Sequence, residues 1–132
     1  YADNKIYLAS RTKSRIAVVD YVTQGLISEF TTVNKPVAMK LYKNLLYILG
    51  AQNNTIQVVN TKNDTVVNNI ELGRDGFSTG FFVIENTNWG VITDVKKNTY
   101  TIIDMASGKI LCTYSVNVPV NEVIITDKVK LF

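Results

Sequence analysis

The sequence of 132 residues contains no histidine and only one cysteine, Cys112. Without histidine, the chain lacks the most common general base and the most common metal ligand of proteins. Catalytic pairs of histidine with serine or cysteine are therefore excluded within this chain, as are histidine zinc sites. A single cysteine excludes an internal disulfide framework and multi-cysteine metal sites. We expect Cys112 to act as a small apolar side chain in an outer strand.

Long hydrophobic runs are also missing. No apolar stretch approaches the roughly 18–20 residues that a membrane-spanning helix needs, and the longest, such as 45–49 and 81–84, are the size of strands. The net charge is only +3, and without blocks of like charge the composition does not support nucleic-acid binding. With 46% hydrophobic residues the chain can nevertheless build a packed core, and its length predicts one domain.

Three similar stretches are what the sequence does contain. Each holds an apolar strand, then a β-branched strand, then a strand of alternating polarity. In this order, the strands of the first stretch are 6–9, 15–20 and 25–30, and those of the second are 46–49, 55–60 and 65–70. Those of the third are 90–93, 99–104 and 109–114. The offset from Ile16 to Ile56 is 40 residues, and that from Ile56 to Tyr100 is 44. Four short strands repeated about every 42 residues are typical of a β-propeller blade. The sequence predicts an all-β fold of four-stranded antiparallel blades, about three in number, as an incomplete ring or as part of a larger propeller.

The fourth strand of each repeat follows a link, and we expect it to lie innermost in its blade. These strands are 37–42, 80–84 and 120–125. Pro36 and Pro119 stand at the start of two of them, where a missing amide donor is tolerated. No pattern typical of a helix is present.

Turn residues recur at the end of each β-branched strand, as Asp20, Asn60 and Asp104. Their side-chain oxygens can accept hydrogen bonds from amides two residues further on and so close a turn. A metal site is the alternative, but no second oxygen ligand recurs beside them. We also expect the strand tyrosines Tyr7, Tyr47 and Tyr100 to pack between blades.

Along the repeat, the features follow one order. A Pro-Val pair leads into an apolar strand, then come Leu-Tyr-Ile, a loop and the strand Ile-x-Val-Val-Asn/Asp, and finally Ser-Gly-Lys and the outer strand. This order resembles the YVTN-type, quinoprotein-like β-propellers of bacteria and archaea, over essentially the whole chain. The resemblance implies a fold more than a function, and it implies a bacterial protein of the periplasm or the exterior. The tryptophan-docking residues of quinone-cofactor enzymes are not evident, and Trp89 is better suited to packing. We therefore expect no cofactor and no enzymatic activity.

Strand order divides the chain into parts of four blades: three strands of a first blade in 5–32, a second blade in 37–72, a third in 80–116 and the first strands of a further blade in 120–132. Three repeats are too few to close a ring of 4–8 blades. Three alternatives follow: the chain is part of a longer propeller, two or more copies assemble with 120–126 completing another copy's first blade, or the three blades form an open stack. A homodimer would then have six blades. Because the first residue is Tyr1 rather than methionine, we expect a processed or excised piece.

Strand order also sorts the loops onto two faces of unequal charge. One face collects seven basic residues, namely Arg11, Lys13, Arg15, Lys35, Arg74, Lys96 and Lys97, against Asp75 and Asp94. Such an excess would steer an acidic partner to this face, although an ordinary solvated face is the alternative. The link 73–80 is four residues longer than its counterparts and carries Arg74 and Phe77, which favours a recognition loop. The alternative for Phe77 is packing between blades.

From these features we predict a non-enzymatic scaffold that binds a protein or other acidic partner, with neither nucleic acid nor a membrane span involved. The predicted partner-binding residues are Arg11, Lys13, Arg15, Arg74, Phe77, Lys96 and Lys97. The alternative is a fragment or subunit of a periplasmic respiratory or quinoprotein-like enzyme, or of its accessory protein, whose catalytic residues lie elsewhere.

Overall fold

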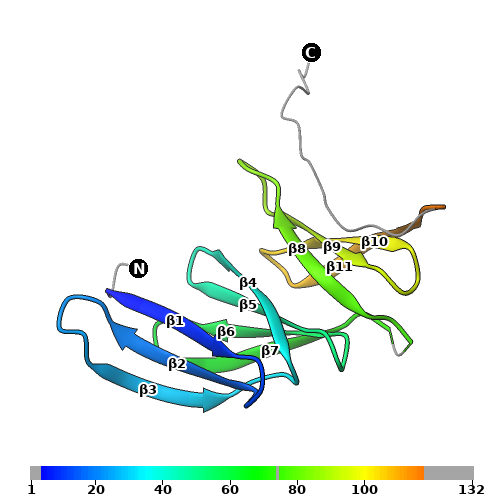
Figure 1. Cartoon of the computed structure of the whole chain (residues 1–132). Helices are drawn as coiled ribbons and strands as arrows, with labels where there is room; N and C mark the ends of the chain where they lie inside the picture. The colour runs from blue at the N-terminus through cyan, green and yellow to red at the C-terminus, as the bar shows by residue number, and fades with distance from the viewer. Residues whose placement is uncertain (1–3, 74, 118–132) are drawn as a thin grey trace.

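The computed structural model of the chain describes residues 4–73 and 75–117, and every regular element in these ranges is a strand. The strands form three antiparallel sheets that stack side by side like a fan (Figure 1). Blade 1 holds β1 (Lys5–Ser10), β2 (Arg15–Asp20) and β3 (Leu26–Thr31); blade 2 holds β4 (Pro36–Tyr42), β5 (Leu45–Gly50), β6 (Thr55–Asn60) and β7 (Thr65–Glu71); blade 3 holds β8 (Ser78–Val83), β9 (Trp89–Asp94), β10 (Thr99–Asp104) and β11 (Lys109–Ser115). The predicted all-β fold of antiparallel, propeller-type blades is confirmed.

Two predictions fall outside the described residues: the further strands in 120–132, with Pro119 before them, and the loop residue Arg74. Within the described ranges no helix is long and apolar enough to cross a membrane.

The core lies between the blades because the side chains of each strand alternate between its two neighbours. In blade 2, Leu46, Ile48 and Val59 pack against Ile16 and Val18 of blade 1. The intervening residues of the same strands face blade 3, where they meet a second buried cluster; these are Tyr47, Leu49, Ile56 and Val58 on blade 2 and Phe81, Ile92 and Ile103 on blade 3. A strand buried on both faces reads as a continuous apolar run, as 45–49 does.

The predicted turns after β2, β6 and β10 are confirmed. The side-chain oxygens of Asp20, Asn60 and Asp104 each accept a hydrogen bond from the amide two residues on, at 2.8–2.9 Å. The turn then needs one residue with positive φ, which glycine adopts without steric cost. Gly108 supplies it in blade 3 with φ 74°, whereas Gln24 (62°) and Asp64 (56°) adopt it in the other blades. The repeated backbone thus persists where the glycine does not.

Each outer strand carries the same one-residue β-bulge. In blade 1, Val18 pairs with Ser28 and Val19 with Leu26, so that Ile27 is left over. The same shift leaves Val67 unpaired in β7 and Leu111 unpaired in β11. A bulge interrupts the ladder and bends the strand locally.

Tyrosine hydroxyls join neighbouring blades at equivalent positions. The Tyr47 hydroxyl of β5 donates to the Met105 carbonyl, the first residue of the turn in blade 3. The Tyr7 hydroxyl of β1 likewise lies 3.3 Å from the Thr61 carbonyl of the corresponding turn in blade 2, and donates to Asp64 at 2.6 Å. Two of the predicted tyrosines therefore do more than pack. Tyr100 instead contacts Tyr114 of its own sheet, with ring centroids 5.3 Å apart.

The buried Tyr47 hydroxyl predicts a specific loss of stability in alkali. Burial, with a smaller contribution from the Asp104 carboxylate, raises the pKa of Tyr47 from 10 to about 12. The contribution of the neutral Tyr47 side chain to the free energy of unfolding is complete below pH 10. It is lost as pH rises from 10 to about 12, because tyrosine in the unfolded chain ionises at a lower pH than Tyr47 in the folded chain. Tyr47→Phe should cost about 1–2 kcal/mol at pH 8 and flatten the decline of unfolding free energy above pH 10. Urea titrations from pH 8 to 12 measure both effects. Tyr21→Phe, at a 47% exposed tyrosine, is the control, and an equal change there contradicts the prediction.

Candidate functional site

Five loops lie along one edge of the stack, which we call the rim. They are the turns 11–14, 51–54 and 95–98 and the links 32–35 and 72–77, the last without residue 74. Figure 1 shows the strands of all three sheets ending at this common edge. The rim is the face to which the sequence assigned its excess of basic residues.

One buried carboxylate organises the rim of blade 3. Asp94 ends β9 and is only 5% exposed. Its Oδ1 atom accepts hydrogen bonds from the backbone amides of Phe77 at 3.1 Å, of Lys96 at 2.9 Å and of Lys97 at 2.9 Å. Three of the predicted partner-binding residues are therefore held on one support. In the sequence, Asp94 counts only as one acidic charge of this face; an aspartate before a short turn is the signal for its structural role.

A buried amide completes the support from blade 2. The Asn54 side chain, 1% exposed, donates to the Gly73 carbonyl at 2.9 Å and accepts from the Ser78 amide at 3.1 Å. Between the two polar groups lies Gly76, where an added Cβ would stand 2.1 Å from the Asp94 carboxylate and 2.3 Å from the Asn54 amide. No side chain fits at Gly76, and Asn54 holds the link at Gly73 and the start of β8 at Ser78.

The side chains on this support are an aromatic ring and two ammonium groups. Phe77 is 37% exposed, and both Lys96 and Lys97 are exposed. The Lys97 ammonium lies over Gly73, 3.0 Å from the position of an added Cβ. Arg11, Lys13 and Arg15 lie on the rim of blade 1, so blade 2 separates them from this group (Figure 1).

The rim is less basic than its loops alone suggest. Arg15 Nε lies 3.8 Å from Glu29 Oε1, with both side chains nearly half exposed. Glu71, at the end of β7, adds a second carboxylate that a count restricted to loops omits. Among the described residues the rim therefore carries six basic against four acidic side chains: Arg11, Lys13, Arg15, Lys35, Lys96 and Lys97 against Glu29, Glu71, Asp75 and Asp94. Within this small excess, Lys96 and Lys97 stand out as adjacent lysines.

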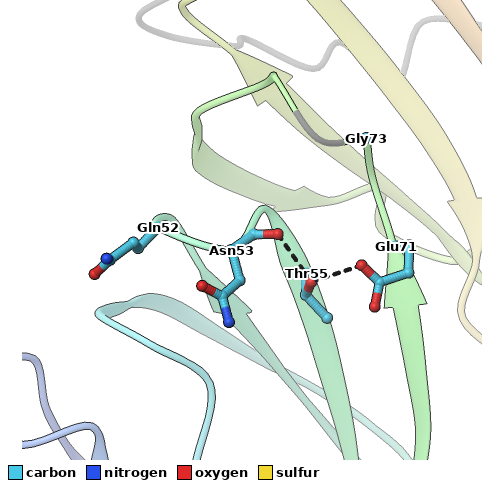
Figure 2. Close-up of a pocket in the computed structure, with 5 residues that line it drawn as sticks. All are labelled: Gln52, Asn53, Thr55, Glu71 and Gly73. Atoms are coloured by element: carbon cyan, nitrogen blue, oxygen red, sulfur yellow. Dashed lines mark hydrogen bonds between the residues drawn. The ribbon is translucent and has the colours of Figure 1, made fainter.

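A polar pocket of about 700 Å³ opens beside this group, between the 51–54 turn and the 72–77 link. Figure 2 shows its lining residues, Gln52, Asn53, Thr55, Glu71 and Gly73. The Thr55 hydroxyl lies 3.0 Å from Glu71 Oε2 and 3.0 Å from the Asn53 carbonyl. The lining offers a carboxylate, two amides and a hydroxyl but no aromatic ring, so it suits a polar group. No sequence motif marked these residues.

Within 4–73 and 75–117, no three His, Cys, Asp or Glu residues come close enough together to hold a metal ion.

No family model and no curated protein matches the sequence. Solved structures do match. Hydrazine synthase of Kuenenia stuttgartiensis superposes with a TM-score of 0.78 over 88% of this chain, at 15% identity. The WD40 repeats of RRP9 superpose with a TM-score of 0.75 over 89%, at 11% identity. This chain has a β-propeller fold. Dihydro-heme d1 dehydrogenase NirN in complex with DHE gives a TM-score of 0.75 over 86% of the propeller chain, at 12% identity.

Identities this low establish the fold alone. The propeller chain spans 34%, 37% and 24% of the lengths of these three proteins, respectively.

Proposed function

We propose that this propeller chain is a non-enzymatic scaffold that binds an acidic protein surface through the rim of blade 3. The observation that carries the proposal is the Asp94 carboxylate, which holds the backbone of Phe77, Lys96 and Lys97 in one fixed arrangement. Exposed aromatic residues are enriched at interfaces, and the two ammonium groups complement the charge of an acidic partner surface. Backbone amides that are already held by hydrogen bonds also lose little entropy when a partner binds.

The neighbouring pocket extends the same surface. Gly73 lines the pocket and also lies next to the Lys97 ammonium. A partner whose carboxylates face Lys96 and Lys97 can therefore place a neighbouring polar side chain against Glu71 and the two amides of the pocket. We propose a bacterial protein of the YVTN type, acting in the periplasm or outside the cell, in keeping with the sequence resemblance.

The proposal is tested with fluorescently labelled poly-L-glutamate as an acidic probe. The double variant Lys96→Glu/Lys97→Glu should weaken binding at least about tenfold, equivalent to about 1.4 kcal/mol, with no change in thermal unfolding. Lys62→Glu/Lys109→Glu is the matched control, because both lysines are exposed on the opposite edge. Equal weakening in the control, or tighter binding of a single-stranded oligonucleotide than of poly-L-glutamate, contradicts the proposal.

A second candidate is a part of an oxidoreductase whose catalytic residues lie elsewhere. It is favoured by two of the similar structures, which belong to a hydrazine synthase and a dihydro-heme d1 dehydrogenase. Native mass spectrometry of the protein purified from its source separates the two candidates. A retained cofactor mass supports the oxidoreductase, whereas the bare protein mass supports the scaffold.

A further inference from the structure

The pocket beside the rim contains more hydrogen-bond acceptors than donors at its fixed positions. The Thr55 hydroxyl, on a residue only 7% exposed, lies 3.0 Å from both Glu71 Oε2 and the Asn53 carbonyl oxygen (Figure 2). A hydroxyl has a single proton to donate, so it satisfies only one of these two oxygens at a time. The other one, together with the second oxygen of the Glu71 carboxylate, is left for donors that a ligand brings.

Glu71 also lacks a cation beside it in the part of the chain that the structure describes. The two ion pairs within 4–73 and 75–117 lie elsewhere, in blade 1 and between blades 1 and 2. The Lys97 ammonium lies next to Gly73, but Lys97 is not among the described residues that line the pocket. The pocket therefore holds an exposed carboxylate without a countercharge, beside the lysines of the rim.

We propose that the pocket binds a basic side chain, lysine or arginine, that the partner carries within its acidic segment. A lysine ammonium brings three donors and an arginine guanidinium five, and neither has an acceptor, so both match the oxygens of Glu71 and Asn53. The pocket volume of about 700 Å³ leaves room for such a long side chain. The inference rests on the proposed function, because it takes the acidic segment to lie on Lys96 and Lys97.

Gly73 places the two kinds of charge close together. Its carbonyl accepts a hydrogen bond from the buried Asn54 side chain at 2.9 Å, and the residue both borders the pocket and lies next to the Lys97 ammonium. A segment that crosses Gly73 therefore meets the positive charge of Lys97 and the negative charge of Glu71. A uniformly acidic segment would bring a carboxylate close to Glu71, and like charges repel. The pocket thus selects partners that place a basic residue among acidic ones.

Fluorescence anisotropy with two matched peptides tests the proposal. The first is a labelled oligo-glutamate with one central lysine, and the second is the same peptide with that lysine acetylated, which removes its charge. We expect the protein to bind the lysine peptide about three- to fivefold more tightly, the size of effect for a charge pair that stays partly in water. Glu71→Gln should abolish this preference. Glu29→Gln removes an exposed carboxylate from the rim of blade 1, and as the matched control it should keep the preference.

Thermal unfolding establishes that both variants are folded. Equal affinity of the wild-type protein for the two peptides overturns the assignment of the pocket and leaves the rim lysines as the binding site. So does a preference that persists in Glu71→Gln, or one that Glu29→Gln abolishes as well. If neither peptide binds, nor poly-L-glutamate, the proposed function fails together with this inference, so the two failures are distinguishable.

Discussion

Replacing Phe81 with alanine should lower the free energy of unfolding by about 3–5 kcal/mol, the largest effect that we expect from a single core substitution. Phe81 is 3% exposed and lies on β8, the strand of blade 3 that contacts β4 and β5 of blade 2. Its ring meets the Tyr47 ring edge-on, with centroids 6.2 Å apart. An added Cβ at Gly90 of β9 would stand 2.8 Å from this ring. The space that the Phe81 ring occupies therefore depends on glycine at position 90. Removal of the ring leaves a cavity between two blades.

Urea unfolding followed by fluorescence measures this loss. The matched control is Phe82→Ala, the next residue of β8, whose side chain points to the opposite face and is half-buried. We expect it to lose about half as much, in proportion to the smaller area removed from water. A control loss as large as that of Phe81→Ala would mean that the core between blades 2 and 3 does not dominate stability.

Replacing Asp94 with alanine should cost about 2–4 kcal/mol, because three backbone amides lose a charged acceptor at once. The effect should be local. Hydrogen exchange at the amides of Phe77, Lys96 and Lys97 should accelerate by at least about tenfold, while exchange in blade 1 remains unchanged. Poly-L-glutamate binding should weaken as well, because the rim then has to be ordered on binding.

Asp94→Asn provides the control for this experiment, since its side-chain oxygen can still accept hydrogen bonds. It should recover most of the stability and slow amide exchange, although neutral acceptors are weaker than charged ones. If the alanine variant exchanges at the wild-type rate, other contacts fix the link and Asp94 is not the organiser of the rim.

The fold could be predicted because its signals are local and repeated. Each strand carries its alternation within six residues, and Asp20, Asn60 and Asp104 mark turns through hydrogen bonds spanning two residues. Repetition at about 42 residues then strengthens signals that are weak in one copy. Even so, the sequence could not show that Gln24 would adopt the positive φ that Gly108 adopts, because that conformation is imposed by the strands on either side.

The site could be predicted only in part. Strand order placed Phe77, Lys96 and Lys97 on the same edge that the structure shows. The hydrogen bonds that hold these residues, however, connect three separate segments: a turn of blade 2, the link between blades 2 and 3, and a turn of blade 3. Asn54 and Asp94 stand 40 residues apart in the sequence, and nothing local reveals that Gly76 lies between them. A charge count based on loop residues also omits Glu29, because this residue lies within a strand. In the structure its carboxylate lies beside Arg15 at the rim.

The bulges at Ile27, Val67 and Leu111 have a consequence for aggregation. A bulge bends an edge strand and puts its donors and acceptors out of register with those of a straight chain laid beside it, which opposes edge-to-edge pairing. We therefore expect the apolar residues on the outer strands to carry a smaller risk of fibril formation than they would on straight edges.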